Sequence, residues 1–281
     1  MFTYNSYMFK VSPTKRNNDR AAREKAEKCT SVVRTGKAAK LLGFKHPLGL
    51  AICYGEGVEE GEASADPFTI ELKMYLEMKG FPHKIHIVDP EKGKNLPEWF
   101  RKNNWDGVLP MTKYDKEQYK LGSAETMMAL EKKFCVPSMS SGGMGAGRFR
   151  GKTVKNLTLS LLKSVRPYDD TNPDWKDLVL EFKELDQYLV QCHGREGDYM
   201  KSKKFSLWDI RMVPALYNLV TIANYFKPGF ALPDEVPHLR SYLQHAFEDP
   251  VFKKFCPTVR KIVRYYEPKL NVRIVLPDDV V

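Results

Sequence analysis

One eight-residue segment, ADPFTIEL at positions 65–72, constrains the fold of this chain more than any other feature. It follows the apolar stretch 48–54 (LGLAICY) and opens a pattern with apolar residues at helical spacing. Asp66 is a good N-cap, Pro67 suits the first helical position, and Gly80 suits the position just past the last turn. We therefore predict a buried strand at 48–54 and a capped helix that begins at Pro67 and ends before Gly80.

Strands and helices continue to alternate up to about position 136. Residues 84–88 (KIHIV) alternate apolar and polar side chains, as a half-buried strand does. Further along, turn and capping residues separate a connector at 95–102, two strands at 111–114 and 118–121, and a helix at 123–134. The predicted order is strand, helix, strand, connector, strand, strand, helix, in an α/β domain over residues 47–136.

The second half of the chain has helical periodicity throughout. Residues 137–152 are rich in Gly and Ser, so we interpret them as an interdomain linker. Helices are predicted at 154–166, 173–193, 206–226, 236–247 and 258–267. An all-α domain at 153–270 and a short tail at 271–281 are therefore expected.

Positive charge is concentrated at the N-terminus. Residues 1–46 hold 11 Lys or Arg against three acids, whereas residues 47–281 hold 34 against 32. We interpret residues 1–46 as a basic extended arm, which favours an acidic partner. The partner that we expect is the acidic protein surface of a larger assembly, such as a cytoskeletal one. Nucleic acid, an anionic membrane and a solvated arm without a partner are the alternatives.

The cysteines and the hydropathy of the chain indicate the kind of cellular compartment in which it resides. The five cysteines are scattered and form no CxxC motif, which is typical of free thiols in a reducing compartment. The sequence contains no run of 18 apolar residues, so no transmembrane helix is predicted, and the first residues do not resemble a signal peptide. We expect a cytoplasmic or other reducing location, with organellar targeting of the basic N-terminus as an alternative.

Four motifs, in the expected order, resemble the glutathione S-transferase superfamily over about residues 48–270. They are Asp66-Pro67-Phe68, Leu109-Pro110, Ser123 at the start of a helix, and the segment Phe205 to Pro214. In the last of these, Ser206 and Asp209 have the spacing of a capping box, for which we expect a structural role and a contribution of roughly 1 kcal/mol. The first motif resembles the redox site of the dehydroascorbate reductase, chloride intracellular channel and omega branch. Residues 238–257 resemble the dehydroascorbate reductases and chloride intracellular channel proteins of that branch.

This resemblance implies a thioredoxin-like N-terminal domain followed by an all-α C-terminal domain, with a cis peptide bond before Pro110. It also implies a cysteine where this chain has Asp66, because family members carry a reactive thiolate directly before Pro-Phe. A carboxylate cannot form a mixed disulfide. Family members usually also have an acidic residue where this chain has Gly122. We interpret the remaining glutathione-binding positions as vestigial; they are Asp66, Phe68, Leu109, Pro110 and Ser123.

The residues singled out also have simpler structural interpretations. Asp66 is most simply a helix cap. Tyr54 ends the first strand, where tyrosine-type transferases carry a sulfur-activating hydroxyl, and it is a weak catalytic candidate because strand-end aromatics are common. His83 and His86 are three positions apart on a strand and so point to opposite faces. We therefore predict no metal site.

Two functions of different classes follow. We expect a catalytically degenerate glutathione-transferase-like protein, a pseudoenzyme that acts as a structural or adaptor subunit through its basic arm and surface. The alternative is a glutathione-dependent transferase or dehydroascorbate-reductase-type enzyme that uses the thiol of glutathione itself; glutathione is then its ligand. Membrane insertion of the chloride intracellular channel type is disfavoured, because the equivalent residues 68–88 carry many charges. The sequence leaves the oligomeric state open.

Overall fold

The structure, a computed structural model, describes residues 51–56, 65–88, 96, 98–104, 106–114, 118–133, 139, 173–193, 199–200, 203–226 and 231–270. Several predicted segments lie outside these residues, namely the arm at 1–46, the linker at 137–152 except Met139, the helix at 154–166 and the tail at 271–281. For these segments the predictions stay predictions.

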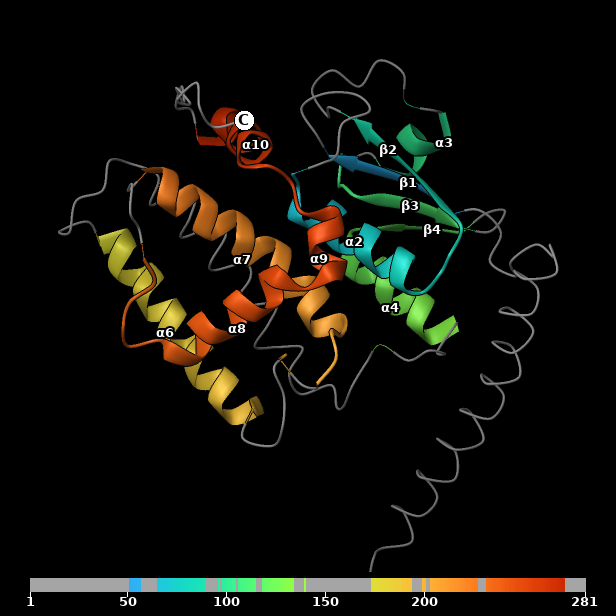
Figure 1. Ribbon diagram of the computed structural model, residues 1–281. Coiled ribbons are helices and arrows are strands. Elements are labelled where there is room, and N and C mark those ends of the chain that lie inside the picture. Colours follow the sequence, from blue (N-terminus) through green and yellow to red (C-terminus); the bar gives the residue numbers. More distant parts are fainter. Residues whose placement is uncertain are drawn as a thin grey trace, which may run out of the picture.

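Four short strands form one mixed sheet in the first half of the chain (Figure 1). The strands are β1 (Ala51–Glu56), β2 (His83–Val88), β3 (Met111–Tyr114) and β4 (Gln118–Leu121), and their order across the sheet is β2-β1-β3-β4. β1 and β2 are parallel, while β3 is antiparallel to both β1 and β4. A parallel pair needs a crossover, and helix α2 (Pro67–Met78) supplies it. The predicted strand-helix-strand beginning is confirmed.

Local signals in the first half correspond to the structure closely. Helix α2 is followed by Gly80, whose φ of 66° is the left-handed conformation expected just past a helix. The peptide bond between Leu109 and Pro110 is cis, as the resemblance implied. Figure 1 shows α2 and helix α4 (Ser123–Lys133) together below the sheet, and the short helix α3 (Glu98–Asn103) on its other side.

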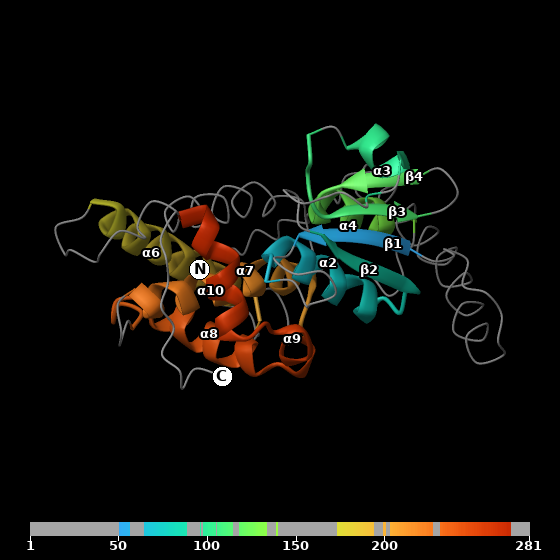
Figure 2. The ribbon, with the colours of Figure 1, turned by 90° about the horizontal axis from the view of Figure 1, so that it is seen from above.

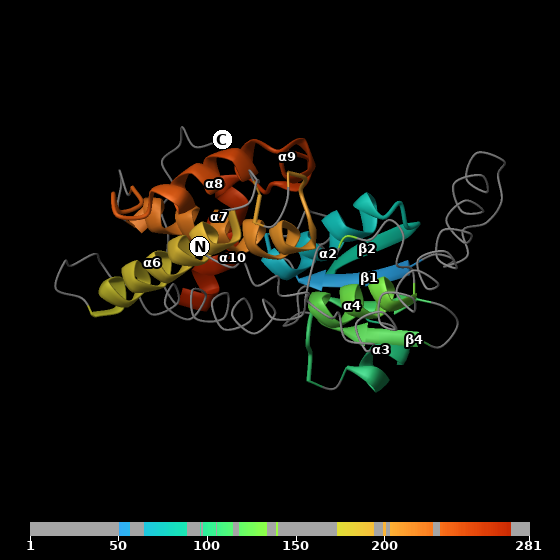
Figure 3. The same cartoon turned by 90° about the horizontal axis from the view of Figure 1, so that it is seen from below.

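The second half is helical, and Figures 2 and 3 show it beside the sheet, with α6 at the end of the molecule far from the strands. Its described helices are α6 (Pro173–His193), α7 (Leu207–Phe226), α8 (Pro237–Glu248), α9 (Pro250–Phe255) and α10 (Val259–Leu270). Four of these were predicted. The exception is α9, a single short helix that begins where the Asp249 side chain accepts a hydrogen bond from the Val251 backbone N–H at 2.7 Å.

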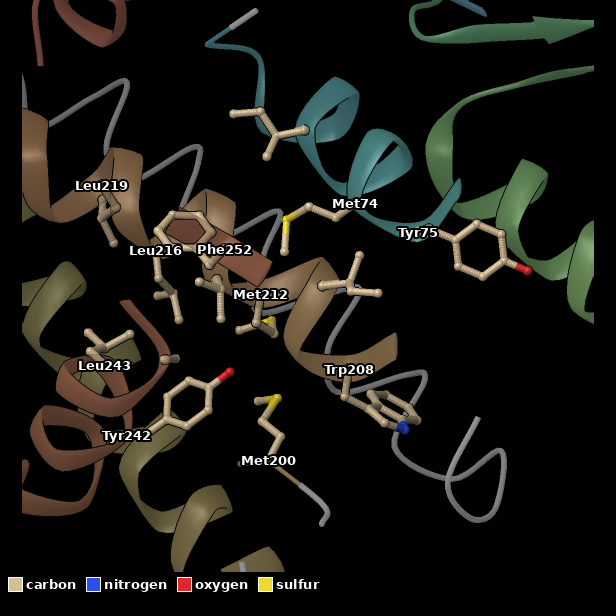
Figure 4. Packing of buried hydrophobic residues seen from close by; sticks show 14 of the residues in the cluster. Met74, Tyr75, Met200, Trp208, Met212, Leu216, Leu219, Tyr242, Leu243 and Phe252 are labelled. Atoms are coloured by element: carbon tan, nitrogen blue, oxygen red, sulfur yellow. The ribbon is translucent and has the colours of Figure 1, made fainter. Parts of the chain in front are cut away.

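Helix α2 joins the two halves in one continuous core. Most of its side chains are buried, because one side packs on the sheet and α4 while the other packs on α7 and α9. Figure 4 shows Met74 of α2 facing the helical half, near Met212 of α7 and Phe252 of α9. The structure therefore consists of a thioredoxin-like α/β unit and an all-α unit, as the sequence predicted, and the two units share an apolar seam.

Candidate functional site

Asp66 caps the N-terminus of α2 and is almost completely buried, with 1% of its surface exposed. Its Oδ2 accepts hydrogen bonds from the backbone N–H and the hydroxyl of Thr69, at 2.7 and 2.6 Å. The predicted cap is confirmed. Gly55 at the end of β1 approaches Thr69 so closely that a Cβ atom there would lie 2.3 Å from Cγ2 of Thr69. This approach helps to enclose the first turn of the helix.

The other carboxylate oxygen of Asp66 is engaged from the helical half. Its Oδ1 accepts a hydrogen bond from the hydroxyl of Tyr265 in α10, at 3.2 Å, and Tyr265 is itself buried. A second contact lies close by, where the side-chain amide of Asn218 in α7 donates to the backbone carbonyl of Ala65 at 2.7 Å. The position at which the resemblance implies a reactive cysteine is thus part of the seam between the two halves.

Ser123 begins α4 and is also buried. Its hydroxyl donates a hydrogen bond to Oε1 of Glu71 in α2, at 2.7 Å. The cis-proline lies next to it in the fold, because the N–H of Gly122 donates to the carbonyl of Pro110 at 2.8 Å. The structure therefore brings together three of the predicted positions, Asp66 and Ser123 around the first turns of α2 and Pro110 beside Ser123.

Glu71 is the residue of this site that sequence reasoning missed. Only 3% of its surface is exposed, and its Oε2 lies 3.7 Å from Nε of Arg211 in α7. Burial raises the pKa of Glu71 to about 8, although Arg211 and the Ser123 hydroxyl oppose the increase. Burial likewise lowers the pKa of Arg211, and the carboxyl of Glu71 opposes that change. A signal was present in the sequence, since Glu71 precedes the buried Tyr75 by one helical turn.

The other predicted site residues are more exposed than this cluster, or their side chains cannot be placed. Phe68 is 40% exposed, whereas Leu109 is half-buried. The side chain of Tyr54 lies outside the described atoms; its backbone pairs with His86 in β2 and Met111 in β3. A catalytic role of Tyr54 therefore stays a prediction.

Ser206 and Asp209 form a buried network at the start of α7. Oδ2 of Asp209 accepts from the backbone N–H and the hydroxyl of Ser206, at 2.9 and 2.6 Å. Its Oδ1 accepts from the N–H of Met200 and the hydroxyl of Tyr242, both at 3.0 Å. The hydroxyl oxygen of Ser206 accepts a hydrogen bond from the backbone N–H of Trp208 at 3.3 Å. The predicted capping box would have had the backbone N–H of Asp209 as the donor instead. Asp209 thus links three segments, which is more than the predicted local cap.

Two kinds of feature are absent from the described part of the chain. Its residues contain no group of three or more His, Cys, Asp or Glu side chains that could hold a metal ion. None of the helices within the described ranges is both long enough and apolar enough to span a membrane.

Known proteins with similar sequences and structures fit this architecture. No protein-family model matches the chain. A probable glutathione S-transferase DHAR2, chloroplastic, of Oryza sativa subsp. japonica is 26% identical over 204 residues, which are 73% of this chain and 70% of that protein. Chloride intracellular channel protein 3 of Mus musculus is 25% identical over 232 residues, 76% of this chain and 94% of that protein.

Among solved structures, the dehydroascorbate reductase of Chlamydomonas reinhardtii superposes with a TM-score of 0.64 and 22% identity. The match covers 78% of this chain and 98% of that one. The chain therefore has the glutathione-transferase fold, and its relatives by sequence are dehydroascorbate reductase and chloride intracellular channel members of the glutathione S-transferase superfamily.

Proposed function

We propose that this chain is a non-catalytic glutathione-transferase-like protein that acts by binding, as a structural or adaptor subunit. The observation that carries the proposal is the environment of Asp66. Both of its carboxylate oxygens accept hydrogen bonds, from Thr69 and Tyr265, and the residue is almost completely buried. A carboxylate has no sulfur with which to form a disulfide. The carboxylate of Asp66 instead links the N-terminus of α2 to α10 through its hydrogen bonds.

The proposed contact surface is the basic arm at 1–46. Its 11 basic residues, against three acidic ones, support an acidic protein surface as the partner. Co-sedimentation with polymerised tubulin, an acidic cytoskeletal surface, tests this at low and high salt. We expect binding that weakens as salt increases and that is lost when the lysines and arginines of the arm are replaced by glutamine. Salt-independent binding, or binding unaffected by the replacements, would contradict the electrostatic role.

A glutathione-dependent enzyme is the second candidate, and the names of the relatives favour it. The rice relative is named a probable glutathione S-transferase, and the algal structure is that of a dehydroascorbate reductase. Such an enzyme would have to activate the thiol of glutathione itself, with Tyr54 as the candidate hydroxyl. The chloroplastic name of the rice relative also supports the organellar alternative for location.

Turnover by the purified full-length chain separates the two candidates. Three glutathione-dependent rates are measured with and without the protein. They are the reduction of dehydroascorbate, the reduction of a small disulfide, and the conjugation of 1-chloro-2,4-dinitrobenzene. We expect no increase in any of the three. Turnover that disappears in Tyr54→Phe but persists in the control Tyr119→Phe, an exposed strand tyrosine, would establish the enzyme instead.

A further inference from the structure

One face of the sheet carries a row of basic and aromatic side chains. The strand register aligns one residue from each of the four strands, namely Lys84, Ile52, Lys113 and Tyr119. Residues that lie directly opposite one another in a sheet point to the same face. Lys113 identifies this face, because its Nζ lies 5.0 Å from the centre of the Trp99 ring in α3. Figure 1 shows α3 on the side of the sheet away from α2 and α4, so we call this surface the α3 face.

The neighbouring residues in the strands support this assignment. Tyr114 follows Lys113 in β3 and belongs to the hydrophobic core, and Ile85 follows Lys84 in β2 and packs against that core. Because side chains alternate between the two faces along a strand, the lysines point away from the core. The α3 face is therefore the side of the sheet that α2 and α4 leave uncovered.

The side chains of the row are open to solvent and positively charged. Lys84 is exposed, Lys113 is partly exposed, and Tyr119 keeps 39% of its surface exposed although it is aromatic. Neither lysine forms an ion pair with a carboxylate of the described residues. Between positions 81 and 121 the described residues include five basic ones against two acidic ones, which are Lys84, Arg101, Lys102, Lys113 and Lys120 against Glu98 and Asp106.

We propose that the α3 face binds single-stranded nucleic acid, with Lys84 and Lys113 contacting phosphates and the ring of Tyr119 stacking on a base. Single strands offer both groups that this surface suits, since the phosphates are anionic and the unpaired bases have free π faces. One common class of RNA-binding domain stacks two or three bases on the aromatic side chains of a four-stranded sheet in this way. An acidic polypeptide would pair with the lysines but would leave the exposed ring without a stacking partner.

This inference goes beyond the proposed function, because it involves no residue of the basic arm at 1–46. The arm would itself attract a polyanion, so the test has to separate the two surfaces. Binding is therefore measured on the full-length chain in two forms, the wild type and the variant in which glutamine replaces the lysines and arginines of the arm.

Fluorescence anisotropy with a fluorescein-labelled oligouridylate of about twelve nucleotides measures the affinity. We expect saturable binding to both forms of the chain. Tyr119→Ala should weaken it about tenfold, whereas Tyr119→Phe, which keeps an aromatic ring, should bind as tightly as the parent chain. If the alanine variant does not fold, Tyr119→Thr takes its place, because threonine suits a strand and also lacks the ring.

The role of the lysines is tested by the salt dependence of binding. Replacing both Lys84 and Lys113 by glutamine should lower the slope of log Kd against log salt by about 1.4, which is about 0.7 for each phosphate contact to a single strand. Lys120→Gln is the matched control. Lys120 is also exposed, but it pairs with the buried Thr112 and so lies on the opposite face of the sheet.

Four results would overturn the proposal. The first is the absence of saturable binding to the arm variant, and the second is equal affinity of the parent chain and Tyr119→Ala. The third is an effect of Lys120→Gln as large as that of Lys113→Gln, since the charge would then act without a defined site. The fourth is competition by polyglutamate as effective as that by unlabelled oligouridylate at equal charge, which would identify an acidic polypeptide as the partner. None of these results bears on the tubulin experiment, which tests the arm.

Discussion

The hydroxyl of Tyr265 donates a hydrogen bond to Oδ1 of Asp66 at 3.2 Å, although the two residues are 199 positions apart in the sequence. The last described helix is thereby fixed to the first helix of the α/β half. Asn218 makes a second connection one residue before Asp66, through the carbonyl of Ala65. The position at which the resemblance implies a nucleophile is, in this chain, part of the seam between the α/β half and the helical half.

Replacement of Tyr265 by Phe should destabilise the protein by about 1.5 kcal/mol, because a buried hydrogen bond to a charged group is lost while the ring is kept. Urea unfolding followed by circular dichroism measures this change. Tyr119→Phe is the matched control, since Tyr119 is an exposed tyrosine in β4. Equal stability of the two variants would show that the contact with Asp66 contributes nothing.

Asp66→Ala should cost about 2 kcal/mol, because it removes both the N-cap acceptor and the acceptor of the hydrogen bond from the Tyr265 hydroxyl. Asp66→Asn retains an acceptor for the Thr69 N–H and should cost less than half as much. The two free energies of unfolding, measured in urea at neutral pH, test the structural role of the Asp66 carboxylate. If neither variant is less stable than wild type, the structural interpretation of Asp66 is wrong.

Glu71 should make the stability depend on pH. Its pKa is raised from 4.5 to about 8, so the folded state binds the proton more tightly than the unfolded chain. The stabilisation linked to this proton is therefore complete below about pH 4.5 and is lost as the pH rises towards 8. The expected slope is at most about 1.4 kcal/mol per pH unit.

Glu71→Gln cannot ionise, so the difference in unfolding free energy between it and wild type should change across pH 5.5, 6.5 and 7.5. The exposed Glu77→Gln on the same helix is the control and should parallel wild type. Parallel curves for Glu71→Gln and wild type would mean that Glu71 is ionised in both states throughout this range.

Asp209→Ala should cost about 3 kcal/mol rather than the roughly 1 kcal/mol expected of a simple cap. The larger value follows because the side chain accepts from Met200 and Tyr242 as well as from Ser206. Ser206→Ala, which removes only the hydroxyl, should cost about 1 kcal/mol. Thermal unfolding measures the loss of stability in both variants. Equal losses would show that the hydrogen bonds from Met200 and Tyr242 to Asp209 contribute no stability.

The fold was largely predictable because its signals are local. Caps, helical periodicity and glycines marked α2, α4 and most helices of the second half to within a few residues. Helix α9 was missed because six residues are too few for an apolar period to emerge. β1 covers Ala51–Glu56 and so continues past the predicted end at position 54, since an apolar run does not specify which of its residues pair. Positions 48–50 of the predicted strand lie outside the described residues.

The candidate site was predictable only in part, for a physical reason. The sequence indicated Asp66, Pro110 and Ser123 as site positions, but their partners depend on long-range packing. Glu71 is 52 residues from Ser123, and a charged residue in a helix is ordinarily solvated. Its burial follows from α2 being covered on both sides, and the only local signal for it is its place one helical turn before Tyr75.

Calorimetric titration of the full-length wild-type chain with glutathione at millimolar concentrations tests the central claim most directly. The Asp66→Cys variant, which restores a thiol at the start of α2, is measured beside it. The account predicts no heat of binding for wild type and a saturable signal for Asp66→Cys. Saturable binding to wild type, accompanied by turnover, would contradict the account and identify the chain as a working glutathione-dependent enzyme.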